Sequence, residues 1–140
     1  MCRAEIITTD WQHDKDALSE IRRKVFIDEQ HVPEQLEWDE DDDSAAHFLA
    51  RTGNRNVGCA RLSAVGKIGR MAVLEQYRNQ GIGRQLLLQV IDHARDKAYP
   101  MLYMHAQASA TGFYDKAGFS VKGEPFMEAG IPHQEMFMQL

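Results

Sequence analysis

The segment from Arg78 to Arg84, Arg-Asn-Gln-Gly-Ile-Gly-Arg, places two glycines at the start of a long amphipathic stretch. Where a strand gives way to a helix, the first backbone N–H groups of the helix have no partner, and the helix dipole is positive there. Glycine at positions 81 and 83 lets the backbone approach an anion closely, because no Cβ is in the way. The segment is therefore predicted to bind a phosphate or pyrophosphate.

Two common nucleotide motifs do not fit this segment. A Rossmann fingerprint would need a third glycine where the chain has Leu86. A nucleotide-triphosphate loop would need Gly-Lys followed by Ser or Thr, whereas Arg84 and Gln85 stand in that place. A plain helix start, with glycines for tight packing, is the alternative that the two glycines alone leave open.

The elements that position this turn follow from hydrophobic periodicity. The predicted strands are 5–9, 46–50, 57–65, 68–74, 101–106, one that begins at 119–122 and a closing one at 136–140. The predicted helices are one that 10–14 initiates, a long one at 82–98 that Pro100 stops, and a short one at 109–116. Strands grouped before a helix and then alternating with helices indicate an α/β (α+β) fold, with a mixed sheet and helices on its faces.

An acidic run separates the first helix from the second strand. Seven of the ten residues from Glu34 to Asp43 are Asp or Glu. A run of this composition does not build a core element, so a loop or frayed turn is predicted.

Composition narrows the class of protein. The chain has 140 residues, 44% of them hydrophobic and 26% charged, which suits one domain over 1–140. Its formal net charge of −5 disfavours nucleic acid as a partner. No apolar stretch approaches the roughly 20 residues of a membrane span, and no secretory leader precedes the first strand, so a cytoplasmic location is expected.

Cys2 and Cys59 are the only cysteines, so neither a disulfide framework nor a metal site is expected. Cys59 is interpreted as a core residue.

Two motifs carry a resemblance to a known family. The pattern Arg78-x-x-Gly81-x-Gly83, which follows Met71-Ala72-Val73 and opens the long helix, resembles the acyl-coenzyme A binding motif of the GNAT superfamily of N-acetyltransferases. Further along, Ala110 to Phe119 resembles that superfamily's Ala-x-x-Phe-Tyr-x-x-x-Gly-Phe segment. The segments 25–33 and 128–136 resemble the signatures of a small bacterial branch, the YjcF-like and ElaA-like acetyltransferases.

The resemblance implies a mixed, mostly antiparallel central sheet flanked by helices and splayed between the fourth and fifth strands. It implies acetyl-coenzyme A (acetyl-CoA) as co-substrate and no metal. Backbone amides of the turn would bind the pyrophosphate, and the pantetheine arm would lie beside the fourth strand like an added strand. The implied cofactor-binding residues are Met71, Ala72, Val73, Arg78, Asn79, Gln80, Gly81, Ile82, Gly83, Arg84 and Tyr114.

The same resemblance implies roles in the reaction. A backbone N–H, that of Val73, would stabilise the oxyanion formed when an amine attacks the thioester directly. Tyr114 would be the general acid. Because a thiol has a pKa of roughly 8.5 and tyrosine one near ~10, Tyr114 would hydrogen-bond the leaving sulfur more readily than it fully protonates it.

A primary amine of a small molecule, or of lysine, is the acceptor expected from the family. With a pKa near ~10 it is mostly protonated at neutral pH, so a side chain or a water chain must accept its proton. The candidate proton acceptors are Glu29, Asp39, His47, His105 and His133. Glu29 and His105 are preferred as catalytic residues, and Glu29, Asp39 and His133 are expected to bind the acceptor.

Three questions stay open at this point. The acidic run suits a cationic acceptor such as a polyamine, although a solvated charged loop is the simpler explanation. An amino-sugar phosphate is an alternative acceptor that an acidic entrance would repel. A non-catalytic coenzyme A binding or sensing module would keep the glycine turn but would not need Tyr114. The superfamily often forms dimers, and apolar residues near the C-terminus would suit a homodimer interface.

Overall fold

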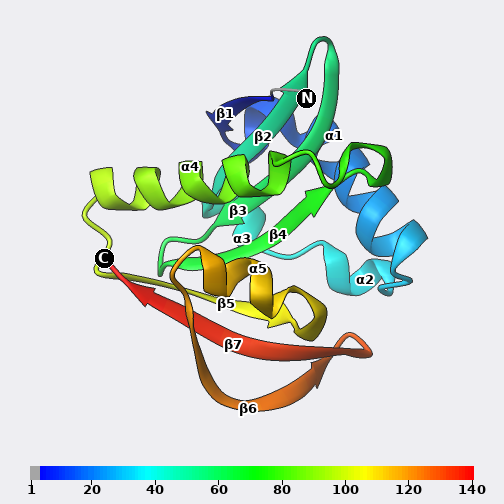
Figure 1. The fold of residues 1–140 in the computed structure, drawn as a ribbon. Helices are drawn as coiled ribbons and strands as arrows, with labels where there is room; N and C mark the ends of the chain where they lie inside the picture. The colour runs from blue at the N-terminus through cyan, green and yellow to red at the C-terminus, as the bar shows by residue number, and fades with distance from the viewer. Residues whose placement is uncertain (1–3) are drawn as a thin grey trace.

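A single seven-stranded sheet with the strand order β1-β2-β3-β4-β5-β7-β6 runs through the computed structural model, which describes residues 4–140 (Figure 1). Cys2 lies outside the described residues. The strands are β1 (Glu5–Thr9), β2 (Ala46–Thr52), β3 (Arg55–Leu62), β4 (Lys67–Val73), β5 (Met101–Gln107), β6 (Ser120–Glu128) and β7 (Ile131–Gln139). Every neighbouring pair is antiparallel except β4 and β5, which are parallel. The mixed, mostly antiparallel sheet is therefore confirmed.

Helices cover both faces of this sheet. The longer helical segments are α1 (Trp11–Arg22), which continues as the π-helical segment η1 (Arg23–Glu29), and α4 (Ile82–Asp96). The shorter ones are α2 (Glu34–Glu37), α3 (Asp41–Ser44), the 3-10 turns η2 (Glu75–Tyr77) and η3 (Ala108–Ala110), and α5 (Thr111–Lys116). In Figure 1, α1, α2 and α3 lie on the side of the sheet opposite α4 and α5.

Two apolar layers, one on each face, hold the helices to the sheet. Leu86 and Val90 of α4 pack with Phe48 of β2 on one face. On the other face, Leu18 and Ile21 of α1 pack with the β2, β3 and β4 residues Leu49, Cys59 and Ala72. Consecutive residues of β2 are buried because both of its faces are covered. Cys59 is 1% exposed, as its interpretation as a core residue requires.

Strand β5 is covered on one face only. Leu102, Met104 and Ala106 are buried in the α4 layer. Because successive side chains of a strand point to opposite faces, the partly exposed residues that alternate with them, among them His105 and Gln107, face the α1 side. This alternation directs His105 toward the cavity described below.

Four predicted elements besides the long helix need correction. The predicted loop at 34–43 contains two single-turn helices, α2 and α3, whose buried acids are described below. The predicted strand 57–65 ends at Leu62. The last two strands are longer than predicted, because β6 is an edge strand that accommodates Gly123 and Pro125 in a bulge between Lys122 and Phe126.

Helix α4 ends at Asp96, two residues before the predicted end, in a left-handed turn made by Ala98. The φ of Ala98 is 60°, a conformation that glycine adopts with far less strain. The Tyr99 N–H donates to the Ala94 oxygen at 2.9 Å, which closes the turn. Because Ala98 is exposed, we expect Ala98→Gly to raise the free energy of unfolding by about 1 kcal/mol. Urea unfolding checks this, and an unchanged or lower midpoint would contradict it.

Candidate active site

Strands β4 and β5 separate shortly after they meet. In their parallel register, Lys67 pairs with Tyr103 and Ile68 pairs with Met104. Beyond these pairs lies a cavity of about 440 Å³, walled by η1, α2, the separated parts of β4 and β5, Tyr114 of α5 and the turn between β6 and β7. The expected opening between the fourth and fifth strands is therefore confirmed.

The edge of β4 that faces the opening offers free backbone groups. The Leu74 N–H donates to the Val57 oxygen at 2.9 Å, toward β3. Because neighbouring N–H groups in a strand point to opposite edges, the Val73 N–H points away from β3, toward the opened side. Arg70, with φ 49°, lies at a bulge in β4 and lines the cavity. An unpaired strand edge of this kind accepts an extended chain as an added strand.

The predicted anion-binding turn lies at the start of α4. Gly81 precedes the helix with φ 84° and has no side-chain cap. The N–H groups of Ile82, Gly83 and Arg84 have no acceptor within residues 4–140. In the same turn, Gln80 Oε1 is buried without a hydrogen-bond partner in the described chain. The free N–H donors fit an anionic ligand at the helix start, whereas Gln80 Oε1 is an acceptor and would need a donor instead.

Tyr114 projects from α5 to the cavity. Its hydroxyl donates to Met71 Sδ at 3.7 Å, and its ring meets Phe113 and Phe119 edge to face. Burial raises the pKa of Tyr114 to about 12. The hydroxyl is therefore protonated at neutral pH, and its present partner, a thioether sulfur, is a weak acceptor.

Glu29 is tied to the anion-binding turn. Its two carboxylate oxygens accept from Arg78 Nη1 and Nη2 at 2.6 and 2.7 Å. These hydrogen bonds lower the pKa of Glu29. Arg78 Nε also donates to the Val73 oxygen at 2.9 Å. The Arg78 side chain thus connects η1 to the end of β4. Glu29 is not among the residues that line the cavity.

His105, His133 and Asp39 all line the cavity. His105 Nδ1 lies 3.0 Å from Glu128 Oε1, and His133 Nε2 lies 3.8 Å from Glu128 Oε2. Within residues 4–140, no three His, Cys, Asp or Glu side chains form a group suited to a metal ion. The structure therefore joins two predicted histidines through a carboxylate that the sequence analysis did not single out.

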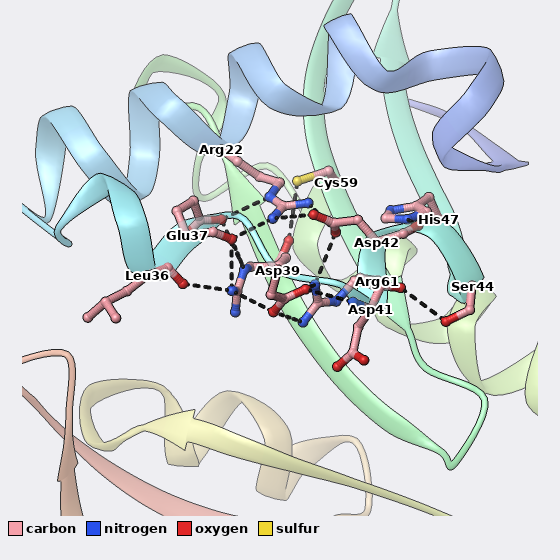
Figure 2. Close-up of polar contacts among 11 residues, drawn as sticks. Arg22, Leu36, Glu37, Asp39, Asp41, Asp42, Ser44, His47, Cys59 and Arg61 are labelled. Carbon is pink, nitrogen blue, oxygen red and sulfur yellow. Dashed lines mark hydrogen bonds and ion pairs between the residues drawn. The ribbon is translucent and has the colours of Figure 1, made fainter.

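The acidic segment that follows η1 is anchored by Arg22 of α1 (Figure 2). Arg22 is 1% exposed and donates to Glu37 and Asp42, with its shortest contact to each at 2.8 Å. The guanidinium also lies between the Trp11 and Trp38 rings, 5.3 and 5.1 Å from their centroids. Glu37 and Asp42 are therefore buried ion-pair partners, which corrects the prediction of a loop or frayed turn.

Two further arginines complete this network from β3 and β4. Arg61 donates to Asp39 at 2.6 Å and to Asp42 at 3.0 Å (Figure 2), and Arg70 contacts Glu37 and Asp39 at 3.0 and 3.1 Å. Burial raises the pKa of Glu37, whereas for Asp42 the hydrogen bonds from the arginines outweigh burial and lower the pKa. Asp39 is thus held by two guanidinium groups at the cavity wall.

His47, another candidate proton acceptor, belongs to the same region. It is 1% exposed, and its Nε2 donates to the Asp42 backbone oxygen at 2.9 Å. Burial lowers the pKa of His47. His47 does not line the cavity, so its contacts are structural.

Several cavity residues were missed by sequence reasoning. They are Gln30, Glu37, Arg61, Lys67, Arg70, Gln107 and Glu128. The alternation of β5 would have placed Gln107 on the face of His105, and Gln107 Nε2 donates to Gln30 Oε1 at 2.8 Å across the cavity. No local pattern pairs Arg22 with acids 15 and 20 residues away.

Comparisons with known proteins agree with this geometry. The family described as "Acetyltransferase (GNAT) domain" matches residues 10–140. A Bacillus subtilis protein described as "Uncharacterized N-acetyltransferase YjcF" is 33% identical over 135 residues, which cover 94% of this chain and 96% of YjcF.

Solved structures give the same result. The crystal structure of Escherichia coli ElaA has a TM-score of 0.88 and 27% identity, and the match covers 98% of this chain and 100% of ElaA. A GNAT family acetyltransferase from Elizabethkingia anophelis with acetyl-CoA bound has a TM-score of 0.67 and 26% identity, with 98% of each chain covered. Among the helices of residues 4–140, none has the length and apolarity to cross a membrane. The chain belongs to the GNAT family of acyl-CoA-dependent N-acetyltransferases, and its relatives include YjcF and ElaA.

Proposed function

We propose that residues 1–140 act as one domain that transfers an acetyl group from acetyl-CoA to a primary amine by direct attack in a ternary complex. The observation that carries this proposal is the cavity between β4 and β5, where Tyr114 and Met71 line one side and His105 the other. A donor on the β4 edge and an acceptor held against β5 would meet between these side chains. The acetyl-CoA bound to the Elizabethkingia relative supports the choice of donor.

The residues present fit acetyl-CoA. The free N–H groups at the start of α4 suit the pyrophosphate, and Gly81 in its left-handed conformation leaves that approach open, with nothing within 4 Å of an added Cβ. The unpaired edge of β4 at Met71, Ala72 and Val73 suits the amide-containing pantetheine arm. Arg78 already donates hydrogen bonds to the Glu29 carboxylate and to the Val73 oxygen. We therefore assign the phosphates to backbone groups and to the exposed Arg84.

Two groups of this chain would act on the reacting atoms. Acetyl-CoA supplies a thioester whose carbonyl carbon receives the amine. The Val73 N–H would donate to the carbonyl oxygen as it becomes negative. The Tyr114 hydroxyl would donate to the sulfur as it leaves. With a pKa of about 12 it stabilises the thiolate by a hydrogen bond rather than by complete proton transfer.

The charges around the cavity bear on the acceptor. Asp42 is buried in ion pairs, so attraction of a cation by the acidic segment would rely on the exposed Asp41 and Asp43. Lys67 and Arg70 line the same cavity. This mixed lining favours a small amine that also carries a polar or anionic group. An amino-sugar phosphate is therefore the second candidate acceptor, because the entrance is less acidic than the sequence alone suggests.

Calorimetric titration with acetyl-CoA, followed by thiol release against polyamines, amino sugars, amino-sugar phosphates and a lysine peptide, tests the proposal. Cys59 adds little background to a thiol assay, since burial raises its pKa to about 12. Binding with thiol release on one amine class supports the enzyme and identifies that class. Binding without release on any amine would favour a coenzyme A sensing module, and no binding would overturn the proposal.

The glycine turn provides a matched pair of variants. We expect Gly81→Ala to raise the Kd for acetyl-CoA about tenfold, because alanine disfavours φ 84° by about 1–2 kcal/mol, so the free turn relaxes and binding must restore the left-handed conformation. Gly53→Ala is the control: Gly53 has φ 59° in the β2–β3 turn and, like Gly81, has nothing within 4 Å of an added Cβ. Equal Kd values for the two variants would contradict the assignment of the pyrophosphate to this turn.

A further inference from the structure

We propose that Glu128 is a positioning residue that holds His105 as the proton acceptor for the amine. This inference rests on the proposed function and assigns the group that the reaction needs on the acceptor side. The contact that carries it is the 3.0 Å distance between His105 Nδ1 and Glu128 Oε1, at the wall of the cavity.

The contact joins two strands that are not neighbours in the sheet. His105 is on β5 and Glu128 ends β6, with β7 lying between them in the sheet. The bulge in β6 between Lys122 and Phe126 is held by Gln134, whose Nε2 donates to the oxygens of Lys122 and Gly123 at 3.0 and 3.1 Å. A bulge bends a strand and redirects the side chains after it. We infer that this bulge aims Glu128 across β7 at His105.

The hydrogen bond fixes which nitrogen of His105 accepts a proton. A carboxylate only accepts hydrogen bonds, so the proton of the neutral ring is on Nδ1. Nε2 then carries the lone pair, and it has no hydrogen-bond partner within residues 4–140. His105, 27% exposed at the side chain, thus presents a proton-accepting nitrogen at the cavity.

Neighbouring rings hold this arrangement. Phe126 packs edge-on against His105, with centroids 5.1 Å apart, and is stacked on His133 at 5.9 Å. His133 Nδ1 donates to the Ile131 oxygen at 2.6 Å, and its Nε2 faces the second Glu128 oxygen. His133 is 8% exposed at the side chain and is committed to the turn, so His105 is the histidine available to the amine.

Glu29, the other preferred proton acceptor, is placed less well. Both of its oxygens are held by Arg78, and it does not line the cavity. Accepting a proton would weaken this ion pair, whereas protonation of His105 adds a cation beside the Glu128 carboxylate. The geometry therefore favours His105.

The protons balance with this assignment. An ammonium group R–NH₃⁺ loses two protons in becoming the amide R–NH–CO–CH₃, as the C–N bond forms and the C–S bond breaks. One proton ends on the sulfur, giving the free thiol of coenzyme A. The other passes to His105 Nε2 and from there to water, so the ring returns to its neutral form.

The test compares Glu128→Ala with Glu135→Ala. Glu135 is opposite His105 on β7 and has no hydrogen bond to its ring. The variant Glu135→Ala therefore removes a nearby negative charge but leaves the contact between Glu128 and His105 in place. Two-dimensional ¹H–¹⁵N spectra of the histidine rings report the tautomer. We expect the Nδ1–H form of His105 in the parent protein and in Glu135→Ala, and a shift to the Nε2–H form in Glu128→Ala.

Kinetics provide the second measurement. With the amine that turns over, Glu128→Ala is expected to lower kcat about tenfold or more, with the KM for acetyl-CoA within about twofold, and Glu128→Asp should recover part of the loss. An Nε2–H tautomer in the parent protein, or equal effects of the two alanine variants, would overturn the proposal. The ring spectra need no substrate, so the tautomer can be tested even if no amine reacts and the proposed function fails.

Discussion

Replacing Arg22 with methionine is expected to lower the free energy of unfolding by about 3–5 kcal/mol, the usual cost of removing one partner from a buried ion pair. The side chain is 1% exposed and donates to Glu37 and Asp42 between two tryptophan rings. Methionine retains an apolar stem, so most of the loss comes from carboxylates left buried with fewer donors. The effect is large because domains are stable by only about 5–15 kcal/mol.

The neighbouring Arg23→Met is the control. Arg23 also makes an ion pair, with Glu34 at 2.6 Å, but both side chains are about half exposed. Solvent screens such a pair, so the unfolding midpoint should hardly change. Urea denaturation followed by tryptophan fluorescence measures both variants. Similar midpoints for Arg22→Met and Arg23→Met would show that the buried network does not anchor the segment.

Replacing Tyr114 with phenylalanine is expected to lower kcat about 10- to 100-fold. A hydrogen bond to a charged group contributes about 1.5–3 kcal/mol, and in the proposed reaction the charged group is the departing thiolate. Because burial raises the pKa of Tyr114 to about 12, the hydroxyl stays protonated at neutral and mildly alkaline pH. The loss should therefore be similar at pH 6 and pH 9, without a change in the shape of the pH profile.

Stability should change little in this variant, since within residues 4–140 the hydroxyl is bonded only to the weak acceptor Met71 Sδ. Tyr103→Phe, on β5 but outside the cavity lining, is the matched control and should retain full turnover. Steady-state rates of thiol release for the two variants decide the matter. A Tyr114→Phe enzyme as fast as Tyr103→Phe would remove Tyr114 from the chemistry.

The fold was predictable where local pattern and burial agree. Helix α4 repeats apolar residues on one face, and all of those from Ile82 to Ala94 are buried. Strand β6 was hard to delimit because it lies at the sheet edge, mostly exposed, with a glycine and a proline inside it. The end of α4 was misplaced because Ala98 takes the left-handed conformation that sequence rules assign to glycine.

The candidate site was predictable in part for a related reason. The glycine turn and Tyr114 are in short motifs with recognisable neighbours. Glu128, which follows the bulge in β6, contacts His105 of β5, and Arg22 of α1 contacts Glu37 of α2. Both pairings join residues far apart in sequence, so neither charge pattern nor periodicity identifies them.

The short parallel register between β4 and β5 also affects how the molecule opens. Local unfolding starts where hydrogen bonds between elements are fewest. In this sheet the fewest such bonds join β4 to β5, so the opening would separate β1 to β4 from the group of β5, β7 and β6. In the proposed complex, a donor lying along β4 would stabilise the folded state by mass action and would link the two groups of strands. The acyl donor would then act as a clamp across the sheet, and the C-terminal group of strands would be most loosely attached after the product has left.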